Sequence, residues 1–454
     1  MKTVDEAARM LGVTQRRVRA LIESGHLAAE KVGGIWLVDE ASLKRRLSEG
    51  VDKRGGRPKK GSGPNEVGLV LMNREHIIAE TVYDATRNVF IKVGPLADKD
   101  RAPLGLTDAR GRISPATLSA WWSDRGIPRA RKGVSELLAQ RGADVPEELV
   151  YRNLGLSLSD QYWVRPVNAD VTWGELNFFQ NDFEQLAVTT NETASRERHP
   201  DNTSDGVLPK HWFIAPDGTR TLAKTGGQFA QEPCNEVIAS ELCRRIVPRE
   251  QGGRARYVAY ELGEWPGCQD ADGTLTCLCP NFLSDEEEFV PAHYVRLTRE
   301  QEPHHSSYQH YLECCHALGI GGDVARELSF GIVCDDIMAN PDRHWRNFGI
   351  VRNVETLECR VAPIFDTGSS LWCDRPDLLA ARDFTFTGKQ FESHPGRQLQ
   401  LAELDWVDTG AIQDLDEYAR DLLAKSALPP ERIDLICQGI RWRVERITNI
   451  CEFL

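Results

Sequence analysis

The stretch N-P-D-R-H-W-R-N-F-G at residues 340–349 is the most informative part of this sequence. It places the carboxylate of Asp342 five positions before the carboxamide of Asn347. A second carboxylate, that of Asp366, follows nineteen residues after Asn347 in the apolar run A-P-I-F-D-T-G. A short apolar run that ends in a turn is typical of a buried strand. We therefore expect Asp366 on such a strand and all three side chains in one cleft.

Transfer of a phosphoryl group from ATP to a hydroxyl needs these groups in this order. One aspartate orients or deprotonates the acceptor hydroxyl, an asparagine binds Mg²⁺, and a second aspartate bridges Mg²⁺ to the β- and γ-phosphates. The spacing from Asp342 to Asn347 is also that of the protein-kinase catalytic loop. The sequence therefore predicts ATP and Mg²⁺ as cofactors, Asp342, Asn347 and Asp366 as catalytic residues, and the last two as metal ligands.

A hairpin upstream supplies a candidate cation for the phosphates. The strand-like residues 211–215, a Pro-Asp-Gly turn and the segment L-A-K-T place Lys224 on the second strand of this hairpin. A lysine fixed on a strand can reach the α- and β-phosphates. Twelve residues after Lys224, Glu236 lies on an expected amphipathic helix at residues 235–246, where it is placed to ion-pair with the lysine and orient it.

The turn-rich loop T-S-D-G-V-L-P-K at residues 203–210 precedes this hairpin. Its one glycine, Gly206, is too little for a Walker A loop. Backbone N–H groups of such a loop, together with the ammonium group of Lys210, can nevertheless cover phosphates. We therefore predict that Gly206 and Lys210 contact the nucleotide.

Between about residues 200 and 375, the order and approximate spacing of these segments resemble a HipA-type serine/threonine kinase, the toxin class of bacterial toxin–antitoxin systems. The loop resembles that family's phosphate loop, in which a hydroxyl can be autophosphorylated, and this makes Thr203 and Ser204 candidates. Residues 121–131 and 155–166 also resemble segments of this family's relatives. The resemblance implies an α+β fold, bilobal and protein-kinase-like with a helical C-lobe, that binds ATP and Mg²⁺.

The motif D-R-H-x-x-N is similar to the catalytic loop of phosphatidylinositol kinases, which makes His344 a second candidate for the base; a structural histidine is the alternative. Three functions stay open. The first is a protein kinase with a toxin-like or autoregulated role in a bacterium. The second is a DNA-binding transcriptional regulator whose kinase-like part only senses a ligand. The third is a kinase for a small molecule or lipid head group.

The first fifty residues predict a small DNA-binding domain. Residues 4–12 and 14–25 have the spacing of two short helices, and residues 26–38 predict a hairpin wing around Gly33 and Gly34. The module resembles a winged helix-turn-helix of the MerR/excisionase type. Three arginines begin its second helix, where this motif meets DNA: Arg16, Arg17 and Arg19. HipA toxins typically have a separate DNA-binding antitoxin, so a fused module favours an autoregulated kinase.

Residues 51–66 predict a basic flexible linker. Its K-R-G-G-R-P-K-K run resembles an AT-hook, in which Arg57 would enter a narrow minor groove; an ordinary charged linker is the alternative. The remaining domains predicted are a kinase N-lobe with an N-terminal extension at residues 67–295 and a helical C-lobe at residues 296–454.

The charge of the chain is divided unevenly. Residues 1–60 hold 14 Lys and Arg and 8 Asp and Glu, a net of +6, whereas the whole chain carries −13, which leaves −19 for the remainder. A basic N-terminal region followed by an acidic remainder indicates that only residues 1–60 bind DNA. The sequence contains no long apolar run and its twelve cysteines are scattered, so we expect a cytoplasmic protein without membrane contact. A homodimer is plausible, because helix-turn-helix proteins commonly read two half-sites.

Overall fold

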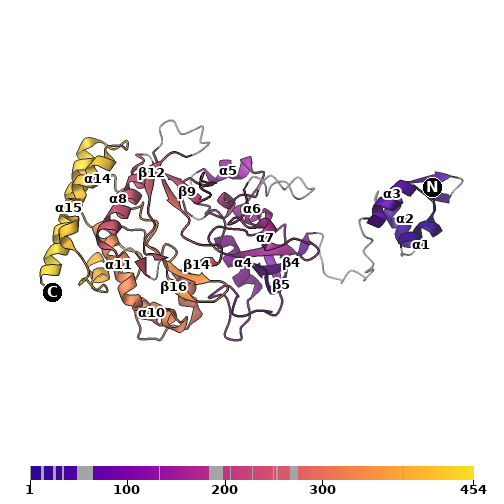
Figure 1. The fold of residues 1–454 in the computed structure, drawn as a ribbon, viewed down its shortest axis with the longest axis horizontal. Coiled ribbons are helices and arrows are strands. Elements are labelled where there is room, and N and C mark those ends of the chain that lie inside the picture. The colour runs from indigo at the N-terminus through magenta and orange to yellow at the C-terminus, as the bar shows by residue number, and fades with distance from the viewer. Residues whose placement is uncertain are drawn as a thin grey trace. The chain divides into compact units, whose positions relative to one another are not determined.

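The computed structural model divides into two compact units, Met1–Pro64 and Asn65–Leu454 (Figure 1). The structure describes residues 2–11, 15–23, 27–32, 35–48, 65–131, 133–183, 198–204, 206–227, 229–248, 250–251, 254–265, 275–381 and 383–453. No helix in these ranges has both the length and the apolar character needed to cross a membrane. Arg57 and the rest of the predicted linker up to residue 64 lie outside the described residues, while Glu66 already begins a strand.

The N-terminal unit has the predicted helix-turn-helix and wing. Its elements are β1 (Lys2–Thr3), α1 (Val4–Leu11), α2 (Gln15–Glu23), β2 (Ala29–Val32), β3 (Ile35–Val38) and α3 (Glu40–Ser48). The wing strands β2 and β3 pair antiparallel, and β1 joins the other edge of β3. The helices pack through apolar residues at helical spacing, among them Val4, Ala7, Leu11, Val18 and Leu21.

Residues 65–454 begin with an antiparallel sheet of strand order β6-β5-β4-β7. Its strands are β4 (Glu66–Asn73), β5 (His76–Asp84), β6 (Val89–Val93) and β7 (Tyr162–Pro166), and the helices nearby in sequence are α4 (Pro115–Asp124), α5 (Val134–Gln140), α6 (Pro146–Arg152) and α7 (Trp173–Leu176). The core of this sheet is rich in aromatic rings, including Tyr83, Phe90, Trp121, Trp122 and Tyr162. Packing therefore accounts for much of residues 121–131 and 155–166.

A second antiparallel sheet has strand order β12-β13-β9-β8. Its strands are β8 (Lys210–Ile214), β9 (Arg220–Thr225), β12 (Glu261–Gly263) and β13 (Thr276–Pro280), and α8 (Gln231–Ile246) follows β9. The predicted hairpin is confirmed, with Lys210 directly opposite Lys224. Residues opposite each other in an antiparallel pair point to one face. Both lysines therefore point to the same side of this sheet.

The third sheet, β14-β15-β16, belongs with the helices of the C-terminal half. Its strands are β14 (Glu287–Pro291), β15 (Gly349–Asn353) and β16 (Cys359–Val361). The helices are α9 (Ala292–Val295), α10 (Ser307–Ala317), α11 (Val324–Ile337), α12 (Leu378–Ala381), α13 (Pro395–Leu399), α14 (Leu415–Leu423) and α15 (Pro430–Glu452). Short elements are β10 (Glu250–Gln251), β11 (Arg254–Ala255), and the 3-10 turns η3 (Pro200–Thr203), η4 (Arg296–Thr298) and η5 (Thr409–Ile412). Strand β14 precedes the lobe boundary predicted between residues 295 and 296, and β15 follows it. Their antiparallel pairing therefore joins the two predicted lobes in one sheet.

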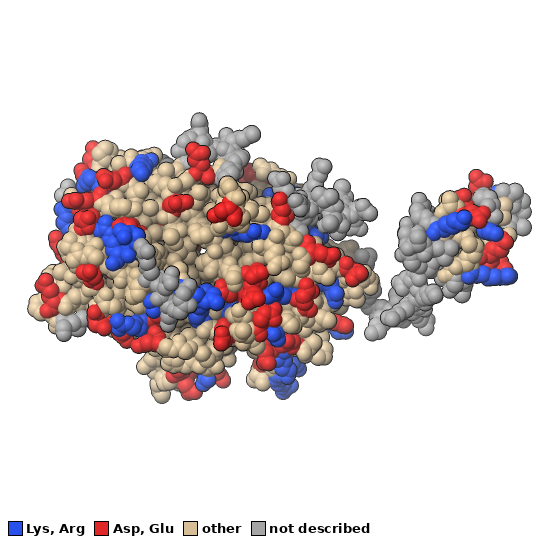
Figure 2. Space-filling model, in the orientation of Figure 1, with Lys and Arg blue, Asp and Glu red and all other residues tan. Residues whose placement is uncertain are grey.

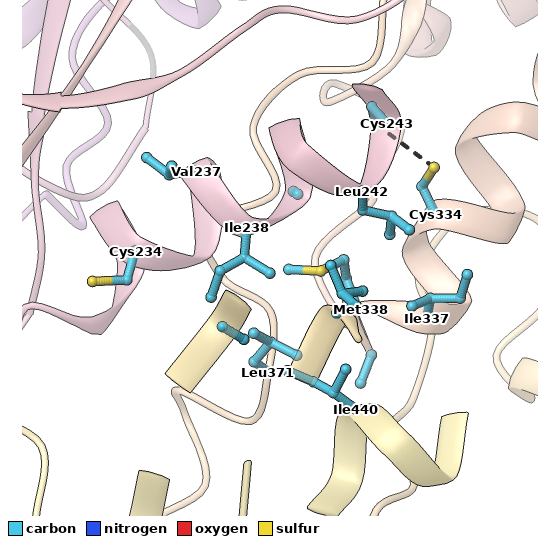
Figure 3. Packing of buried hydrophobic residues seen from close by; sticks show 14 of the residues in the cluster. Cys234, Val237, Ile238, Leu242, Cys243, Cys334, Ile337, Met338, Leu371 and Ile440 are labelled. Atoms are coloured by element: carbon cyan, nitrogen blue, oxygen red, sulfur yellow. Dashed lines mark hydrogen bonds between the residues drawn. The ribbon is translucent and has the colours of Figure 1, made fainter. Parts of the chain in front are cut away.

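The largest apolar core joins α8 to α11 and α15 (Figure 3). Buried side chains from these elements interlock, among them Ile238, Leu242, Ile337, Met338 and Ile440. The thiols of Cys243 and Cys334 lie 3.7 Å apart in this core. Burial of several such side chains contributes about 1.5–3 kcal/mol each. Helix α8, which carries Glu236, is therefore held rigidly by the helical half of the chain.

One face of residues 65–454 is mixed in charge. On the face drawn in Figure 2, acidic and basic side chains are interspersed. Exposed pairs such as Arg326 with Glu403 and Asp405 illustrate this pattern. On this face, acidic side chains therefore lie among basic ones.

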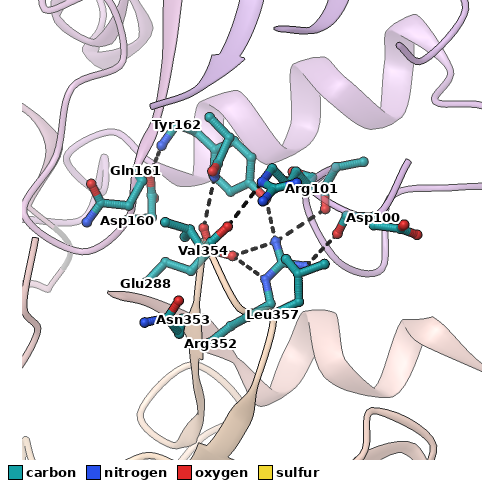
Figure 4. Close-up of polar contacts among 12 residues, drawn as sticks. Asp100, Arg101, Asp160, Gln161, Tyr162, Glu288, Arg352, Asn353, Val354 and Leu357 are labelled. Carbon is teal, nitrogen blue, oxygen red and sulfur yellow. Dashed lines mark hydrogen bonds and ion pairs between the residues drawn. The ribbon is translucent and has the colours of Figure 1, made fainter. Parts of the chain in front are cut away.

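A buried ion pair ties the third sheet to the first (Figure 4). Arg352 on β15 approaches the carboxylate of Glu288 on β14 to 2.6 Å, and its guanidinium also donates to the hydroxyl of Tyr162 at 2.7 Å. Asn73 on β4 donates to the other carboxylate oxygen at 3.2 Å. Burial raises the pKa of Glu288, and the charge of Arg352 opposes that rise. The two side chains are only 4% and 1% exposed, so each charge is stabilised by the other rather than by water.

We predict that Arg352→Leu lowers the free energy of unfolding of this unit by about 3–5 kcal/mol, because it leaves Glu288 buried without its cation. The double variant Arg352→Leu with Glu288→Met should regain most of this loss. Denaturant unfolding measures both. Arg420→Leu, which breaks an exposed pair with Asp434, is the control and should cost less than about 1 kcal/mol. Equal losses for the two arginine variants would contradict the assignment.

Candidate active site

A cavity of about 530 Å³ brings together the predicted catalytic and nucleotide-contacting residues of the kinase region. Its lining includes Thr203, Ser204, Gly206, Lys210, Lys224, Glu236, Asp342, His344, Asn347 and Asp366. These residues come from the segment before β8, from β8, β9 and α8, and from the two segments that flank β15 and β16. Segments far apart in the sequence thus converge on one cavity, as the order of the motifs predicted.

Lys224 occupies the centre of a buried charged cluster. Its Nζ lies 2.9 Å from Oε1 of Glu236 and 2.7 Å from Oδ1 of Asp366, and it donates to the hydroxyl of Tyr260 at 3.1 Å. Burial alone would lower the pKa of Lys224, but Asp366 and Glu236 outweigh it and raise that pKa well above its ordinary value. The lysine is therefore held as a cation inside the protein.

Asp366 is held as an anion by the same cluster. Burial would raise its pKa, yet the charges of Lys224 and Lys210 keep that pKa below its ordinary value. Its backbone has φ of 57°, in the left-handed region that non-glycine residues seldom adopt. The strained backbone directs an ionised carboxylate toward the cation and the cavity.

Arg343 connects the two predicted catalytic segments. Its buried guanidinium pairs with Asp335 at 2.8 Å, donates to the carbonyl oxygen of Asn347 at 2.8 Å and reaches the hydroxyl of Thr367 at 3.0 Å. It also donates to the carbonyl oxygen of Phe365. One side chain thereby fixes the loop of residues 342–347 beside Asp366.

Four side chains of the 342–347 loop line the cavity, those of Asp342, His344, Arg346 and Asn347. Nδ2 of Asn347 donates to the carbonyl oxygen of Asp342 at 2.9 Å, so its Oδ1 is the atom left for a cation. The carboxylate of Asp342 lies 2.7 Å from Nζ of Lys389, a residue that sequence reasoning missed. His344 lines the cavity, and its Nδ1 accepts the backbone N–H of Arg346 at 3.3 Å.

The loop before β8 has the close contacts expected of a backbone cradle. Gly206 has φ of 103°, and a Cβ there would lie 2.3 Å from Nζ of Lys210. The buried guanidinium of Arg131 donates to the carbonyl oxygen of Gly206 at 2.8 Å and to that of Ser204. The hydroxyl of Thr203 donates to the carbonyl oxygen of Leu156 at 2.7 Å. Arg131 and Leu156 belong to the two upstream segments at residues 121–131 and 155–166. These segments therefore hold the loop of residues 203–210 in place.

The donor set suits Mg²⁺ and a nucleotide. Carboxylate and carboxamide oxygens, available from Asp366 and Asn347, are ligands that Mg²⁺ prefers, and Lys224 and Lys210 provide positive charge for phosphates. Three rings form an apolar wall of the same cavity, with the centroid of Phe365 5.3 Å from that of Phe282 and 5.2 Å from that of Phe289. A flat aromatic base fits such a wall. The residues therefore fit both groups.

The candidate DNA contacts lie on the second helix of the N-terminal unit. Arg16, Arg17 and Arg19 all belong to α2, and the side chain of Arg19 is exposed. The side chains of Arg16 and Arg17, like Arg57, lie outside what the structure describes.

Comparison with known proteins supports the N-terminal prediction. Residues 3–50 match the helix-turn-helix domain family, which confirms the predicted helix-turn-helix. A search of curated proteins found no match.

Solved structures similar to this chain include two proteins. The proinflammatory kinase CtkA of Helicobacter pylori is 14% identical with a TM-score of 0.37, over 54% of this chain and 96% of that one. HipA, in a toxin–antitoxin complex with HipB and operator DNA from Shewanella oneidensis MR-1, is 13% identical with a TM-score of 0.45, over 83% and 97%. The chemistry of the site follows from the residues of this chain.

The buried cluster predicts a pH-dependent effect of Lys224→Met. In the wild type, the lowered pKa of Asp366 means that its stabilisation is present above its ordinary value of 3.8 and is lost only below it. The raised pKa of Lys224 means that its stabilisation is present below its ordinary value of 10.5 and is lost only above it. The contribution of the pair is therefore constant between pH 5 and pH 9.

Without the lysine, Asp366 faces Glu236 with no cation between them, so the pKa of Asp366 rises and the variant gains stability as pH falls. We expect Lys224→Met to cost about 3–5 kcal/mol at pH 7 and less at pH 5, by roughly 1.4 kcal/mol for each unit by which the pKa of Asp366 in the variant exceeds 5. Denaturant unfolding at both pH values measures this. Lys389→Met, at a half-exposed lysine, is the control and should show a pH-independent difference. A constant difference for Lys224→Met would refute the cluster.

Proposed function

We propose that this chain is an ATP-dependent protein serine/threonine kinase of HipA type with a DNA-binding N-terminal unit. The observation that carries the proposal is the position of Lys224, held between Glu236 and Asp366 on the wall of a cavity that also contains Asp342 and Asn347. A buried cation beside two oxygen donors and a separate carboxylate is the set of groups that phosphoryl transfer needs.

ATP and Mg²⁺, when bound, supply the phosphoryl group and a divalent cation that offsets its charge. Asn347 and Asp366 would hold the cation, and Lys224 and Lys210 would bind phosphate oxygens. Glu236 keeps Lys224 in place through the 2.9 Å contact. The loop at residues 203–210, braced by Arg131, would cover the phosphates with backbone N–H groups.

Asp342 would orient the acceptor hydroxyl and accept its proton, with His344 as the second candidate for that role. Its carboxylate pairs with Lys389, whose side chain is 56% exposed. The acceptor hydroxyl can therefore displace the exposed ammonium group of Lys389 from the carboxylate of Asp342.

The proposed acceptor class rests on two hydroxyl side chains of the predicted phosphate loop. Thr203 and Ser204 line the cavity that contains Asp342, which favours a protein hydroxyl and includes autophosphorylation. Both residues are buried and the Thr203 hydroxyl already donates to Leu156, so transfer to either requires the loop to open. A loop that must open before it is phosphorylated suits an autoregulated, toxin-like kinase in a bacterial cytoplasm. We propose further that the domains divide as the sequence predicts and that the chain binds DNA as a homodimer.

We predict that Asp342→Asn and Asp366→Asn each lower transfer of labelled phosphate from ATP by about 100-fold or more, because each removes an electrostatic group of the transition state. The assay incubates the full chain with γ-labelled ATP and Mg²⁺, and mass spectrometry then locates phosphate on the protein. Asp434→Asn, an exposed aspartate on α15, is the control and should keep full activity.

Full activity in both site variants would refute the assignment. Nucleotide binding by the wild type without transfer would favour a DNA-binding regulator with a sensing domain. Transfer to a metabolite or lipid head group alone would favour a small-molecule kinase.

For the DNA-binding unit, we predict that Arg16→Ala, Arg17→Ala and Arg19→Ala each weaken binding of a mixed-sequence duplex and reduce its salt dependence. Removing one arginine–phosphate pair lowers the slope of log K against log salt by about 0.9. Fluorescence anisotropy over a salt series measures both. Arg326→Ala makes the same charge change on α11 in the other unit and should leave both values unchanged. Unchanged slopes in all three variants would exclude α2 from the interface.

A further inference from the structure

Three side chains outside the proposed catalytic set converge just before β8. Oδ2 of Asp201 lies 2.6 Å from Nδ1 of His211 and 3.1 Å from Nδ1 of His199. Asp201 belongs to η3, His199 is the residue directly before η3, and His211 is on β8. Among the described residues, this is the group of His, Cys, Asp and Glu whose ligand atoms approach closely enough to share an ion, all within 4.8 Å of one another.

The carboxylate of Asp201 is oriented by the backbone. Its Oδ1 accepts the N–H of Trp212 at 2.8 Å, which leaves Oδ2 to face the two imidazoles. A hydrogen bond that fixes one carboxylate oxygen is what commonly orients the other toward a metal. Oδ2 is therefore an oxygen ligand directed at the two rings.

The hydrogen bonds of this group leave two acceptor atoms face to face. Nδ1 of His199 accepts the backbone N–H of Asp201 at 3.2 Å, so in the neutral ring this nitrogen carries a lone pair and no proton. The same nitrogen lies 3.1 Å from the carboxylate oxygen Oδ2. Two lone pairs at that distance repel unless a cation lies between them. Nδ1 of His211 is directed at the same oxygen, so a cation between these atoms would have three ligand atoms around it.

Aromatic rings surround this group and leave it partly open. The rings of His199 and His211 are parallel within 2° with centroids 5.1 Å apart, and Trp265 stacks on His211 at 5.5 Å. Phe183 meets the ring of His199 edge-on at 5.3 Å. The side chains of His199, Asp201 and His211 are 19%, 14% and 28% exposed. A small ion can therefore enter, and a water molecule can complete its coordination.

We propose that His199, Asp201 and His211 form a binding site for a divalent transition-metal ion, Zn²⁺ in the first place. Two imidazole nitrogens and one carboxylate oxygen, with one position open to water, are a common tetrahedral set for this ion. Bonds of about 2.0–2.1 Å place tetrahedral ligands roughly 3.3 Å apart. The observed separations of 2.6 and 3.1 Å reach that value with shifts below 1 Å.

The ion would join the two ends of the loop at residues 203–210. Asp201 precedes this loop and His211 follows it, so one ion would close a segment of about ten residues. Metal-binding free energy gained only in the closed conformation stabilises that conformation. If the loop covers phosphates, as the proposed function holds, the site sets the shape of the phosphate cradle; binding of the ion does not depend on that function.

The test is zinc binding by the full chain in the absence of nucleotide. After dialysis against a chelator, the protein is titrated with Zn²⁺ in competition with a chromophoric chelator. We expect Asp201→Asn and His211→Gln each to bind about one equivalent less than the wild type. Asn keeps an acceptor for the Trp212 N–H, so Asp201→Asn retains the backbone contact. His304→Gln, at an exposed histidine on the same chain, is the control and should match the wild type.

X-ray absorption of the zinc-loaded wild type provides a readout that does not depend on how the variants fold. Histidine nitrogen and oxygen ligands without sulfur are expected. Equal zinc content in the wild type and both variants, sulfur ligation by cysteines, or no stoichiometric zinc in the wild type would each overturn the proposal. Because no ATP is present, these results are independent of whether the chain transfers phosphate.

Discussion

The site depends on one constraint, the burial of the ammonium group of Lys224. A lysine in a protein interior is stable as a cation only if anions and hydrogen bonds replace its lost hydration. Glu236 and Asp366 supply the anions at 2.9 and 2.7 Å, and they come from a helix and from a segment 142 residues away. Strand β9, helix α8 and the segment around Asp366 must therefore meet at one point, which forms one wall of the cavity.

Two further buried cations extend this arrangement. Arg343 holds the loop of residues 342–347 to the segment of Asp366 through Asp335, Asn347 and Thr367. Arg352 holds β14 and β15 to the first sheet through Glu288 and Tyr162. Replacing buried ion pairs by apolar residues of similar volume is often neutral or stabilising. We therefore interpret these pairs as devices that specify geometry, so that a polar cavity can persist between packed sheets.

Much of the local structure and part of the site could be predicted from the sequence. The helices and wing of the N-terminal unit, the hairpin that carries Lys224 and the helix that carries Glu236 follow from apolar spacing and turn residues. Other contributors gave no such signal. Lys389 meets Asp342 across 47 residues, and Arg131 meets Gly206 across 75. Tyr260 was missed for the same reason, because periodicity reports only neighbours along one element.

The sequence by itself determined which ionisable groups the chain carries, in what order, and on which kind of local element most of them lie. It did so because propensity, capping and apolar spacing act over a few residues. The strand expected at Asp366 was wrong, because Ile364 forms only an isolated bridge with Tyr257 and Asp366 lies outside any strand. Only the tertiary structure decided which of these groups touch: the lysine with two carboxylates, the arginine with the loop, and the two histidines with Asp201. Such contacts arise when whole sheets and helices pack, and packing is decided by the combined shape and burial of many residues distant in sequence.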